Sequence, residues 1–531
     1  MKSRATPNKN QPNDIAFLLA ELSGKQQCIT EQTDMISEQA VVIERKSELI
    51  SEQQNRIAFL EEALRLSKVK RFAPSSEKSG QQSLFDEAEV EALQTDDDEF
   101  ETPSDSTVKK KKTGRKPFSD KLPREQIFLD LSEEEKAGAI ETFYSKVKEE
   151  LDIIPAKVRI LEYMQEKAIF VEQEQRQIKT AALPRHPLGK AMGSISLMCF
   201  VIISKYADGL PLYRLENILS RYGGDISRAT LANWVIALAK QLQPLMNLMR
   251  EHQHSGPLIF ADETRVQVLK ESKRSTASDK YMWVTLGGPP DEKSVLFEYD
   301  PSRSQEVPLR LLDGFGGYLQ TDGYAGYNAA CKKYELIQLG CWDHVRRKFI
   351  EAQKAQPKKK GKNNTPSKAD MVLSDINKLY RIERTIKTLD TEEKYQQRQV
   401  QSIPTLNKLR DYLEKNQHKV PKDSLTGQAM TYLSNQWEKL TVYCTDGQLN
   451  ISNILAENAI RPFVIGRKAW LFSDTPAGAH ASAVHYSLIE TAKANGLEPY
   501  DYLKQVLTAL PYTETVEELE ALLPWNIKKK G

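Results

Sequence analysis

An apolar residue recurs at every seventh position near the start of the chain. The residues concerned are Ile15, Leu22, Ile29, Ile36, Ile43, Ile50, Ile57 and Leu64. A helix packed on its own domain does not need a strict seven-residue period, whereas the seam of a coiled coil does. We therefore expect residues 14–67 to form one long helix that self-associates. The other seam position is polar, at Gln32, Gln39, Lys46 and Gln53, so this coil should be only moderately stable.

A polar segment with blocks of like charge follows the heptad segment. Residues 96–101 read DDDEFE and residues 109–116 read KKKKTGRK. Low hydrophobicity and runs of like charge are typical of disorder, so residues 71–124 are predicted to be a linker. Its basic block, which includes Arg115 and Lys116, either contacts DNA phosphates without sequence preference or is simply solvated.

The composition favours a cytoplasmic protein with several domains, because 531 residues can form more than one core. Five cysteines are scattered with no CxxC pair, which argues against a disulfide framework and against a zinc finger. The longest apolar run, near residues 197–203, is too short to span a bilayer. With 75 basic and 73 acidic side chains, the net charge of +2 says nothing directly about a polyanionic partner.

Residues 193–248 carry a helical pattern that a glycine pair interrupts. The helix after this pair begins behind Ser227, a residue type that caps helix amino termini. The pattern is typical of a helix-turn-helix, which would place Arg228 and Asn233 near a DNA groove. A plain helical hairpin fits the same pattern about as well.

From residue 256 onward the pattern changes to short apolar strands. The predicted strands are 257–262, 266–269, 281–285, 295–299, 317–321 and 336–339. We expect the first of them to pair antiparallel. Asp262 ends the first strand, and Asp322 directly follows the strand at 317–321. One acid at a strand end is usually a turn residue, but two acids at the ends of neighbouring core strands suggest a metal site.

A third acid, Glu457, lies in an uncharged and then basic segment. Apolar residues at helical spacing place it on a short helix that Pro462 should end or kink. Because Arg461 is one turn away, an exposed Glu457–Arg461 ion pair is the simplest interpretation of this segment alone. The composition that follows is typical of a surface that contacts phosphates and stacks on a base: a turn at Gly466, then Arg467, Lys468 and Trp470.

Together the three acids fit a site for hard cations. Mg²⁺ prefers oxygen ligands and keeps several waters, so a few converging carboxylates hold it, and Mn²⁺ is an alternative. Two ions about 3.5–4 Å apart activate the attacking oxygen and stabilise the leaving oxygen in phosphodiester chemistry. Asp262, Asp322 and Glu457 would then be the metal ligands, and the ions would relieve the repulsion among them.

Several longer stretches occur in a familiar order: LPLYRLENILSRYGGDISRATLANWV, FADET, YLQTDGYAGYN, CWDHVRRKF and AENAIRPFVIGRKAWLF. On these stretches the chain closely resembles the DDE transposases of the insertion sequence 66 family, from about residue 183 to residue 503. The resemblance implies a ribonuclease H-like catalytic core in a multi-domain α/β chain. It also implies that Asp262, Asp322 and Glu457 are the catalytic acids, and that residues 370–418 belong to a helical insertion between the last two.

The activity that the resemblance implies is metal-dependent phosphoryl transfer on DNA. The protein would bind the terminal inverted repeats of a bacterial insertion sequence, hydrolyse a strand at each end and join the freed 3′ hydroxyls to target DNA. It would act in the cytoplasm at the nucleoid, as at least a dimer, and two small companion proteins typically accompany family members. The side chains expected to contact DNA are Arg115, Lys116, Arg228, Asn233, His344, Arg346, Arg347, Lys348, Arg461, Arg467, Lys468 and Trp470.

One segment departs from the family pattern. Members usually carry a cysteine-rich zinc-binding segment before the catalytic domain, but residues 125–180 contain no cysteine and no histidine. No zinc is therefore expected there. Residues 157–171 read as a strand pair or an extended segment instead. Cys341 and His344 form a CxxH pair, which is weak evidence for a metal without two further ligands.

Two other functions share parts of this pattern. A non-catalytic DNA-binding protein derived from a transposase would keep the helix-turn-helix and the coil but lose an acid, and all three are present. A ribonuclease H-like nuclease would share the acids but cleave without strand joining and without preference for particular ends.

The expected organisation has eight segments. They are a coiled-coil helix (1–70), a charged linker (71–124), a small domain in place of the zinc segment (125–182), a helical DNA-binding region (183–250), the first part of the core (256–350), a helical insertion (351–445), the part of the core with Glu457 (446–495) and a helical tail (496–531).

Overall fold

The computed structural model describes residues 11–72, 158–172, 175–189, 191–272, 274–276, 278–356 and 366–527. The predictions for the charged linker, with Arg115 and Lys116, and for residues 125–157 lie outside these ranges. Within them, no helix combines the length and the apolar character that crossing a membrane requires.

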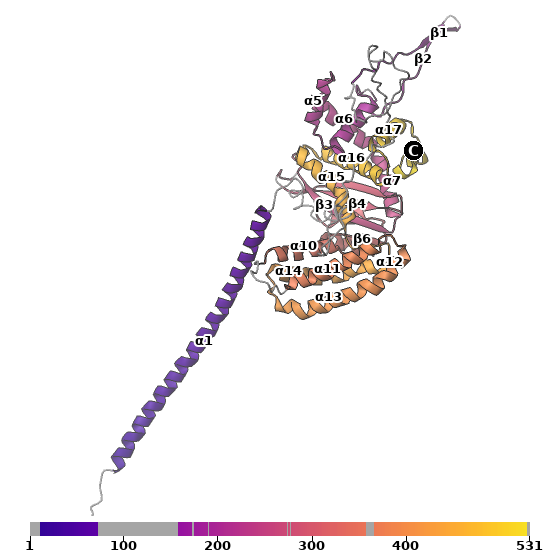
Figure 1. Cartoon of the computed structure of the whole chain (residues 1–531). Coiled ribbons are helices and arrows are strands. Elements are labelled where there is room, and N and C mark those ends of the chain that lie inside the picture. The colour runs from indigo at the N-terminus through magenta and orange to yellow at the C-terminus, as the bar shows by residue number, and fades with distance from the viewer. Residues whose placement is uncertain are drawn as a thin grey trace, which may run out of the picture.

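The heptad segment forms a single helix, α1 (Gln11–Phe72), that extends away from the other described helices and strands (Figure 1). The predicted long helix is therefore confirmed, whereas its coiled-coil pairing stays a prediction. In the single chain the seam faces solvent, with Ile36 and Ile43 both 66% exposed. The last turns of α1 bond to other described elements: Glu62 Oε2 accepts a hydrogen bond from the Leu425 N–H (2.9 Å) and Arg65 Nε donates to the Ala355 carbonyl (2.9 Å).

A mixed sheet in the order β5-β4-β3-β6-β7 forms the centre of the molecule. Its strands are β3 (Leu258–Val266), β4 (Lys280–Gly287), β5 (Ser294–Asp300), β6 (Tyr318–Gln320) and β7 (Ile337–Leu339). The first three pair antiparallel as expected, while β6 and β7 run parallel to β3. The predicted separate strand at 266–269 is wrong: β3 itself continues to Val266, and Val268 makes only an isolated bridge to Ser473.

Helices cover the sheet on both sides (Figure 1). One side carries α4 (Ile195–Tyr206), α5 (Leu212–Arg221), α6 (Arg228–Gln241), α7 (Gln243–His254), α15 (Ile454–Trp470), α16 (Pro476–Ala494), α17 (Pro499–Ala509) and α18 (Val516–Glu520). Five further helices lie at the β6–β7 end of the sheet, and most of them share a core with Leu339. They are α10 (Trp342–Lys354), α11 (Lys368–Thr385), α12 (Thr391–Gln397), α13 (Ile403–Asn416) and α14 (Leu425–Thr441). Two short helices, α8 (Glu306–Leu311) and α9 (Asn328–Lys333), connect the strands and cover the opposite face of the sheet, where they pack on Ile259, Trp283 and Leu319.

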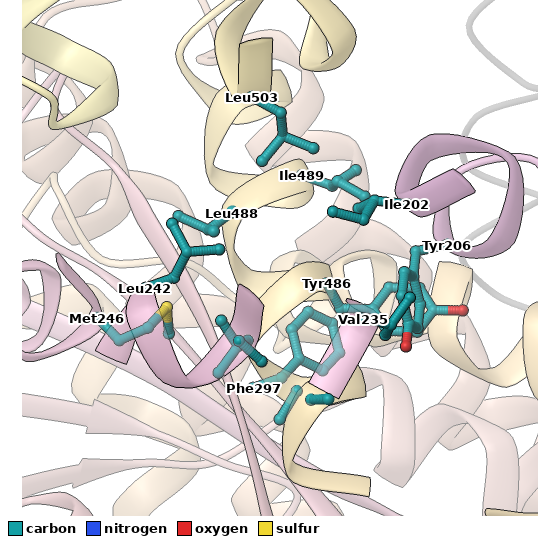
Figure 2. Packing of buried hydrophobic residues seen from close by; sticks show 14 of the residues in the cluster. Ile202, Tyr206, Val235, Leu242, Met246, Phe297, Tyr486, Leu488, Ile489 and Leu503 are labelled. Atoms are coloured by element: carbon teal, nitrogen blue, oxygen red, sulfur yellow. The ribbon is translucent and has the colours of Figure 1, made fainter. Parts of the chain in front are cut away.

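The largest core lies between the sheet and α16, where Phe297, Tyr486 and Tyr206 pack with residues of α4, α6 and α17 (Figure 2). Helix α16 also protects the open edge of the sheet. Its Ser487 and Thr491 hydroxyls accept hydrogen bonds from the Phe297 and Val295 N–H groups of β5 (2.7 and 2.9 Å). Edge strands with unpaired N–H groups are a liability for aggregation, so buried hydroxyls are well placed on an otherwise apolar helix.

The two helices expected around the glycine pair are α5 and α6. Ser227 caps α6 by accepting a hydrogen bond from the Thr230 N–H (3.2 Å), as predicted. A strand pair or an extended segment was predicted at residues 157–171. Residues 158–166 contain no helix or strand, and the antiparallel hairpin β1 (Lys167–Glu172) and β2 (Gln175–Thr180) lies later than predicted.

Arg398 lies at the centre of the helical insertion, in a π-helical turn before α13. Its guanidinium forms a two-pronged ion pair with Glu383 (2.9 and 2.7 Å). It also donates to the carbonyls of Tyr443, Asp446 and Leu449 (2.8, 2.8 and 2.9 Å). Because these carbonyls belong to the loop that leads into α15, Arg398 fixes the approach to Glu457.

Arg398→Met should destabilise the protein by about 3–5 kcal/mol, because it leaves the buried carboxylate of Glu383 without its partner. Arg410→Met is the matched control: Arg410 is 54% exposed and pairs with Glu414 on the surface, so its loss should cost less than about 1 kcal/mol. Urea unfolding at neutral pH measures both. Equal effects of the two substitutions would contradict the role given to Arg398.

Candidate active site

The sheet register brings Asp262 and Asp322 together. Strand β3 pairs parallel with β6, with Leu258 opposite Tyr318 and Phe260 opposite Gln320. The same offset, continued just beyond the end of β6, places Asp322 beside Asp262. The prediction that Asp262 ends its strand is wrong, since β3 runs on to Val266. Asp322 lies in a loop beside a strand residue, Asp262, because β6 is short and ends at a point where β3 continues.

The loop after β6 holds Asp322 through its backbone. Gly323 adopts a positive φ of 89°, which only glycine adopts without strain. This turn lets the Tyr324 N–H donate to Asp322 Oδ1 (2.9 Å). From the helical insertion, the Tyr432 hydroxyl donates to the Asp322 carbonyl (2.8 Å). The carboxylate position is therefore set both by the turn and by α14.

Glu457 reaches the same place from α15, which packs on β3 and β4. The side chain is only 7% exposed, so the interpretation of an exposed Glu457–Arg461 ion pair is wrong. Pro462 was predicted to end or kink the helix, and it does not end it, because α15 continues to Trp470 with the proline inside. The predicted turn at Gly466 is wrong for the same reason. Burial of Ile460, Phe463 and Val464 on the sheet side stabilises the helix across the proline.

Two buried amides connect the three acid-bearing segments. Asn453, just before α15, donates from Nδ2 to the Ala261 carbonyl of β3 (3.0 Å) and from its backbone N–H to Cys341 Sγ (3.3 Å). Gln320 of β6 donates from Nε2 to the carbonyls of Gly340 and Asn450 (3.2 and 2.9 Å). Asn453 therefore joins the start of the Glu457 helix to β3, which carries Asp262. Gln320 joins the loop before that helix to β6, which precedes Asp322. Sequence reasoning missed both residues.

The cluster of carboxylates is electrostatically unfavourable without a counter-charge. Burial raises the pKa of Asp262 well above its usual range, and the charges of Glu263, Asp322 and Glu457 add to the effect. Burial also raises the pKa of Glu457 to about 7; Asp343 and Asp322 contribute, and Arg347 opposes the shift. Glu457 Oε1 is buried and has no hydrogen-bond partner in the described part of the chain. A buried carboxylate oxygen without a hydrogen bond, in the field of Asp322 and Asp343, is a suitable ligand for a divalent cation.

Helix α10 contributes the counter-charge that is present. His344 Nδ1 lies 3.7 Å from Glu457 Oε1, and Arg347 Nη2 lies 4.0 Å from Glu457 Oε2. Burial lowers the pKa of His344, and the charge of Arg347 adds to this. The ligand atoms of Cys341, His344 and Glu457 all lie within 4.8 Å of one another. Cys341 and His344 thus have a third potential metal ligand beside them, but this ligand is Glu457, which belongs to the cluster of three acids.

A second network, also missed from the sequence, lies around Glu263. The side chain of Glu263 is 2% exposed and pairs with Arg303, whose Nε lies 2.8 Å from Oε1. The Tyr327 hydroxyl donates to the other carboxylate oxygen (3.0 Å). Arg303 also stacks on the Tyr324 ring at 4.0 Å. Since Tyr324 donates its N–H to Asp322, this network connects the loop of Asp322 to β3. The feature of the sequence that could have revealed this network is Glu263 itself, the second acid in FADET.

The structure gathers only some of the residues predicted to contact DNA. His344 and Arg347 lie against Glu457, and Arg467 Nη1 lies 3.3 Å from Thr264 Oγ1 on β3. Arg228 and Asn233 are exposed on α6, well away from α10 (Figure 1). Two further residues of α10 contact the insertion: Arg346 donates to Asn377 (3.2 Å), and Lys348 lies 4.7 Å from the Tyr432 ring centroid. On α15, Lys468 is exposed and Arg461 is partly buried. The Trp470 ring packs between Phe463 and Lys205.

Comparisons with known proteins identify similar sequences along most of the chain. Residues 190–481 match the family described as Transposase IS66 family, residues 487–525 match the IS66 C-terminal element, and residues 59–127 match Transposase C of IS166 homeodomain. The uncharacterized protein y4qI of Sinorhizobium fredii is 33% identical over 72% of this chain and 71% of its own length. The uncharacterized protein y4jD of the same organism is 29% identical over 77% of this chain and 81% of its own.

The raised pKa of Glu457 predicts a pH-dependent cost of folding in metal-free protein. A carboxyl whose pKa is 4.5 when unfolded and about 7 when folded loses stability as pH rises through that interval, by on the order of 3 kcal/mol. Glu457→Gln cannot ionise, so in EDTA its advantage over the wild type should grow between pH 5 and pH 8. Urea unfolding at the two pH values measures this, and an advantage that does not change with pH would contradict it.

Proposed function

Because the chain belongs to the IS66 transposase family, we propose that it is a DDE-type transposase that cleaves and joins DNA strands at the ends of an insertion sequence. Asp262, Asp322 and Glu457 are its catalytic acids. The observation that carries this proposal is that the three acids lie close enough to interact: the β3–β6 register aligns the two aspartates, and the charges of Asp322 and Glu457 both raise the pKa of Asp262.

The architecture supports a ribonuclease H-like core, as the family implies. A mixed sheet carries Asp262 on its middle strand, Asp322 just after the adjacent strand, and Glu457 on a helix packed against them. Helices α11 to α14 fill the interval between Asp322 and Glu457, which supports the helical insertion. The insertion is part of the site's support, because Tyr432 of α14 bonds the Asp322 backbone.

The three acids would hold Mg²⁺ or Mn²⁺, which would neutralise their charge and activate a water or a 3′ hydroxyl for attack on a phosphodiester. The chain's own side chains act around them. Asn453 and Gln320 keep the acid-bearing segments aligned. Arg347, 4.0 Å from Glu457, carries a fixed positive charge beside the scissile phosphate. His344, whose pKa is lowered by burial, offers a neutral imidazole that hydrogen-bonds phosphate oxygens at neutral pH.

DNA binding by other parts of the chain completes the proposal. The match of residues 59–127 to a homeodomain-described transposase region supports DNA contacts there, and exposed Arg228 and Asn233 on α6 offer a second contact. The terminal inverted repeats and the target would both be double-stranded DNA. Two small companion proteins, and pairing through α1 to bring two ends together, belong to the same proposal, as does action at the bacterial nucleoid in the cytoplasm.

Asp262→Asn and Glu457→Gln should each reduce strand cleavage by at least about 100-fold, because each removes charge that binds the metal and stabilises the transition state. Binding of duplexes carrying the element's ends should persist. The assay is cleavage and joining of labelled end DNA in Mg²⁺, with EDTA as a blank. Glu490→Gln, which changes a buried acid on α16 outside the acid cluster, is the control. Cleavage that survives either substitution would refute the assignment.

Self-association through α1 is tested by a matched pair of substitutions. Ile43 lies on the heptad seam and Val41 lies off it, yet the two are 66% and 65% exposed in the single chain. Ile43→Asp should weaken dimerisation at least about tenfold, because two buried isoleucines are lost per coil. Val41→Asp should have little effect. Sedimentation equilibrium gives both constants, and equal behaviour of the variants would exclude the seam.

A further inference from the structure

Helix α15 ends in a strained turn that presents two apolar side chains to solvent. Leu471 adopts φ 63° and ψ −50°, and the Phe472 N–H donates to the Trp470 carbonyl (2.8 Å). These values define a γ-turn of the rare type with positive central φ. A branched residue such as leucine is disfavoured there, because its Cβ crowds the backbone. Glycine or asparagine would adopt this conformation at lower cost.

The turn is fixed from both sides. The Leu471 N–H donates to the Arg467 carbonyl of α15 (2.7 Å). Beyond the turn, the Ser473 N–H donates to the Gln267 carbonyl (2.9 Å), and the Leu269 N–H donates to the Ser473 carbonyl (3.1 Å). The surrounding structure therefore imposes the strain, and strain of this kind is concentrated at functional sites.

The two side chains at the turn gain little from folding. Leu471 is 64% exposed and Phe472 is 43% exposed. A strained backbone that buried a leucine would be explained by the core, but this leucine faces solvent. The cations beside it are Arg467, which is partly buried, and Lys468, which is exposed. Lys270 is also exposed but forms an ion pair with Asp474 (2.7 Å). Apolar side chains flanked by cations are complementary to the stacked bases and the phosphates of a nucleic acid.

The turn lies along the strand that carries Asp262. Arg467 contacts Thr264, two residues beyond Asp262 (Nη1 to Oγ1, 3.3 Å), and Ser473 bridges Val268, six residues beyond it. Six residues of extended chain span at most about 20 Å, which corresponds to about six base-pair steps of duplex at 3.4 Å each. Leu471 and Phe472 therefore lie within about six base-pair steps of a phosphate bound at the acid cluster.

We propose that Leu471 and Phe472 form an apolar wedge that inserts between base pairs next to the cleaved phosphate of the element's end. This inference rests on the proposed function and adds to it a DNA-distorting element. Inserted apolar side chains unstack the adjacent bases and kink the duplex. Unstacking is useful here because Glu457 is only 7% exposed, so a scissile strand must leave the regular duplex to reach the acids.

The test uses end duplexes that carry the fluorescent base 2-aminopurine at each of the first six positions beside the cleavage site. Wild-type protein should increase the fluorescence at one or two positions, because the probe brightens when it unstacks. In the variant with both Leu471→Ser and Phe472→Ser, this increase should disappear and cleavage should fall about tenfold, as expected for the loss of one stacking contact. Mismatched bases at the same positions should restore cleavage. Ile465→Ser, an exposed apolar residue earlier on α15 (42%), is the control and should behave as the wild type.

A second variant separates the wedge from a role in folding. Leu471→Gly permits the positive φ without strain, so its melting temperature should equal or exceed that of the wild type while the fluorescence increase is reduced. A lower melting temperature would show that Leu471 serves the fold, which would overturn the proposal.

The remaining outcomes are distinct. Wild-type protein that cleaves its ends without any fluorescence increase, or a double variant that cleaves normally, overturns the wedge and leaves the transposase proposal intact. A double variant that loses self-association while keeping the fluorescence increase identifies the pair as a protein contact, so the wedge is wrong. Wild-type protein that neither binds nor cleaves the ends overturns the proposed function, and the wedge falls with it.

Discussion

The repulsion among buried carboxylates is the constraint on which the rest of the structure depends. Asp262, Asp322 and Glu457 converge, and burial together with mutual repulsion raises the pKa of Asp262 and of Glu457. A fold that served only stability would place apolar side chains there, because an unpaired buried charge costs several kcal/mol. The chain instead keeps the acids together and places Arg347 at the edge of the cluster.

Holding such a cluster requires rigid connections from several directions. Asn453 bonds β3, Gln320 bonds the loop before α15, and Arg398 bonds three carbonyls of the segment leading to that loop. These connections are polar and buried, so each is worth more in the interior than it would be on the surface. They explain why the helical insertion is integral to the site: its loop delivers Glu457, and its Tyr432 bonds the Asp322 backbone.

The features that were predicted correctly are those that a local sequence pattern determines. The heptad helix, the antiparallel strands, the cap at Ser227 and the two helices around the glycine pair all follow from periodicity and capping. The catalytic role of the three acids, which came from strand ends and from a resemblance, stays a prediction. The errors came from tertiary packing. Pro462 does not end α15, because the apolar face of that helix is buried on the sheet. The strand boundary at Asp262 was also wrong, because β3 continues beyond the point where its partner β6 ends. Asn453 and Arg398 carry no local signal, since a buried amide and a buried guanidinium look like surface residues in a sequence.

Helix α10 connects the acid cluster to the amino-terminal helix. Near its start it carries His344 and Arg347, which contact Glu457, and just after its end the Ala355 carbonyl accepts a hydrogen bond from Arg65 of α1. A cation at a helix carboxyl end and the Glu62 carboxylate at the start of α14 both complement the helix dipoles. The thirteen residues of α10 span only about 20 Å of rigid helix. The position of α1 is therefore linked through one short helix to the side chains that contact Glu457, although the two regions are far apart in the sequence.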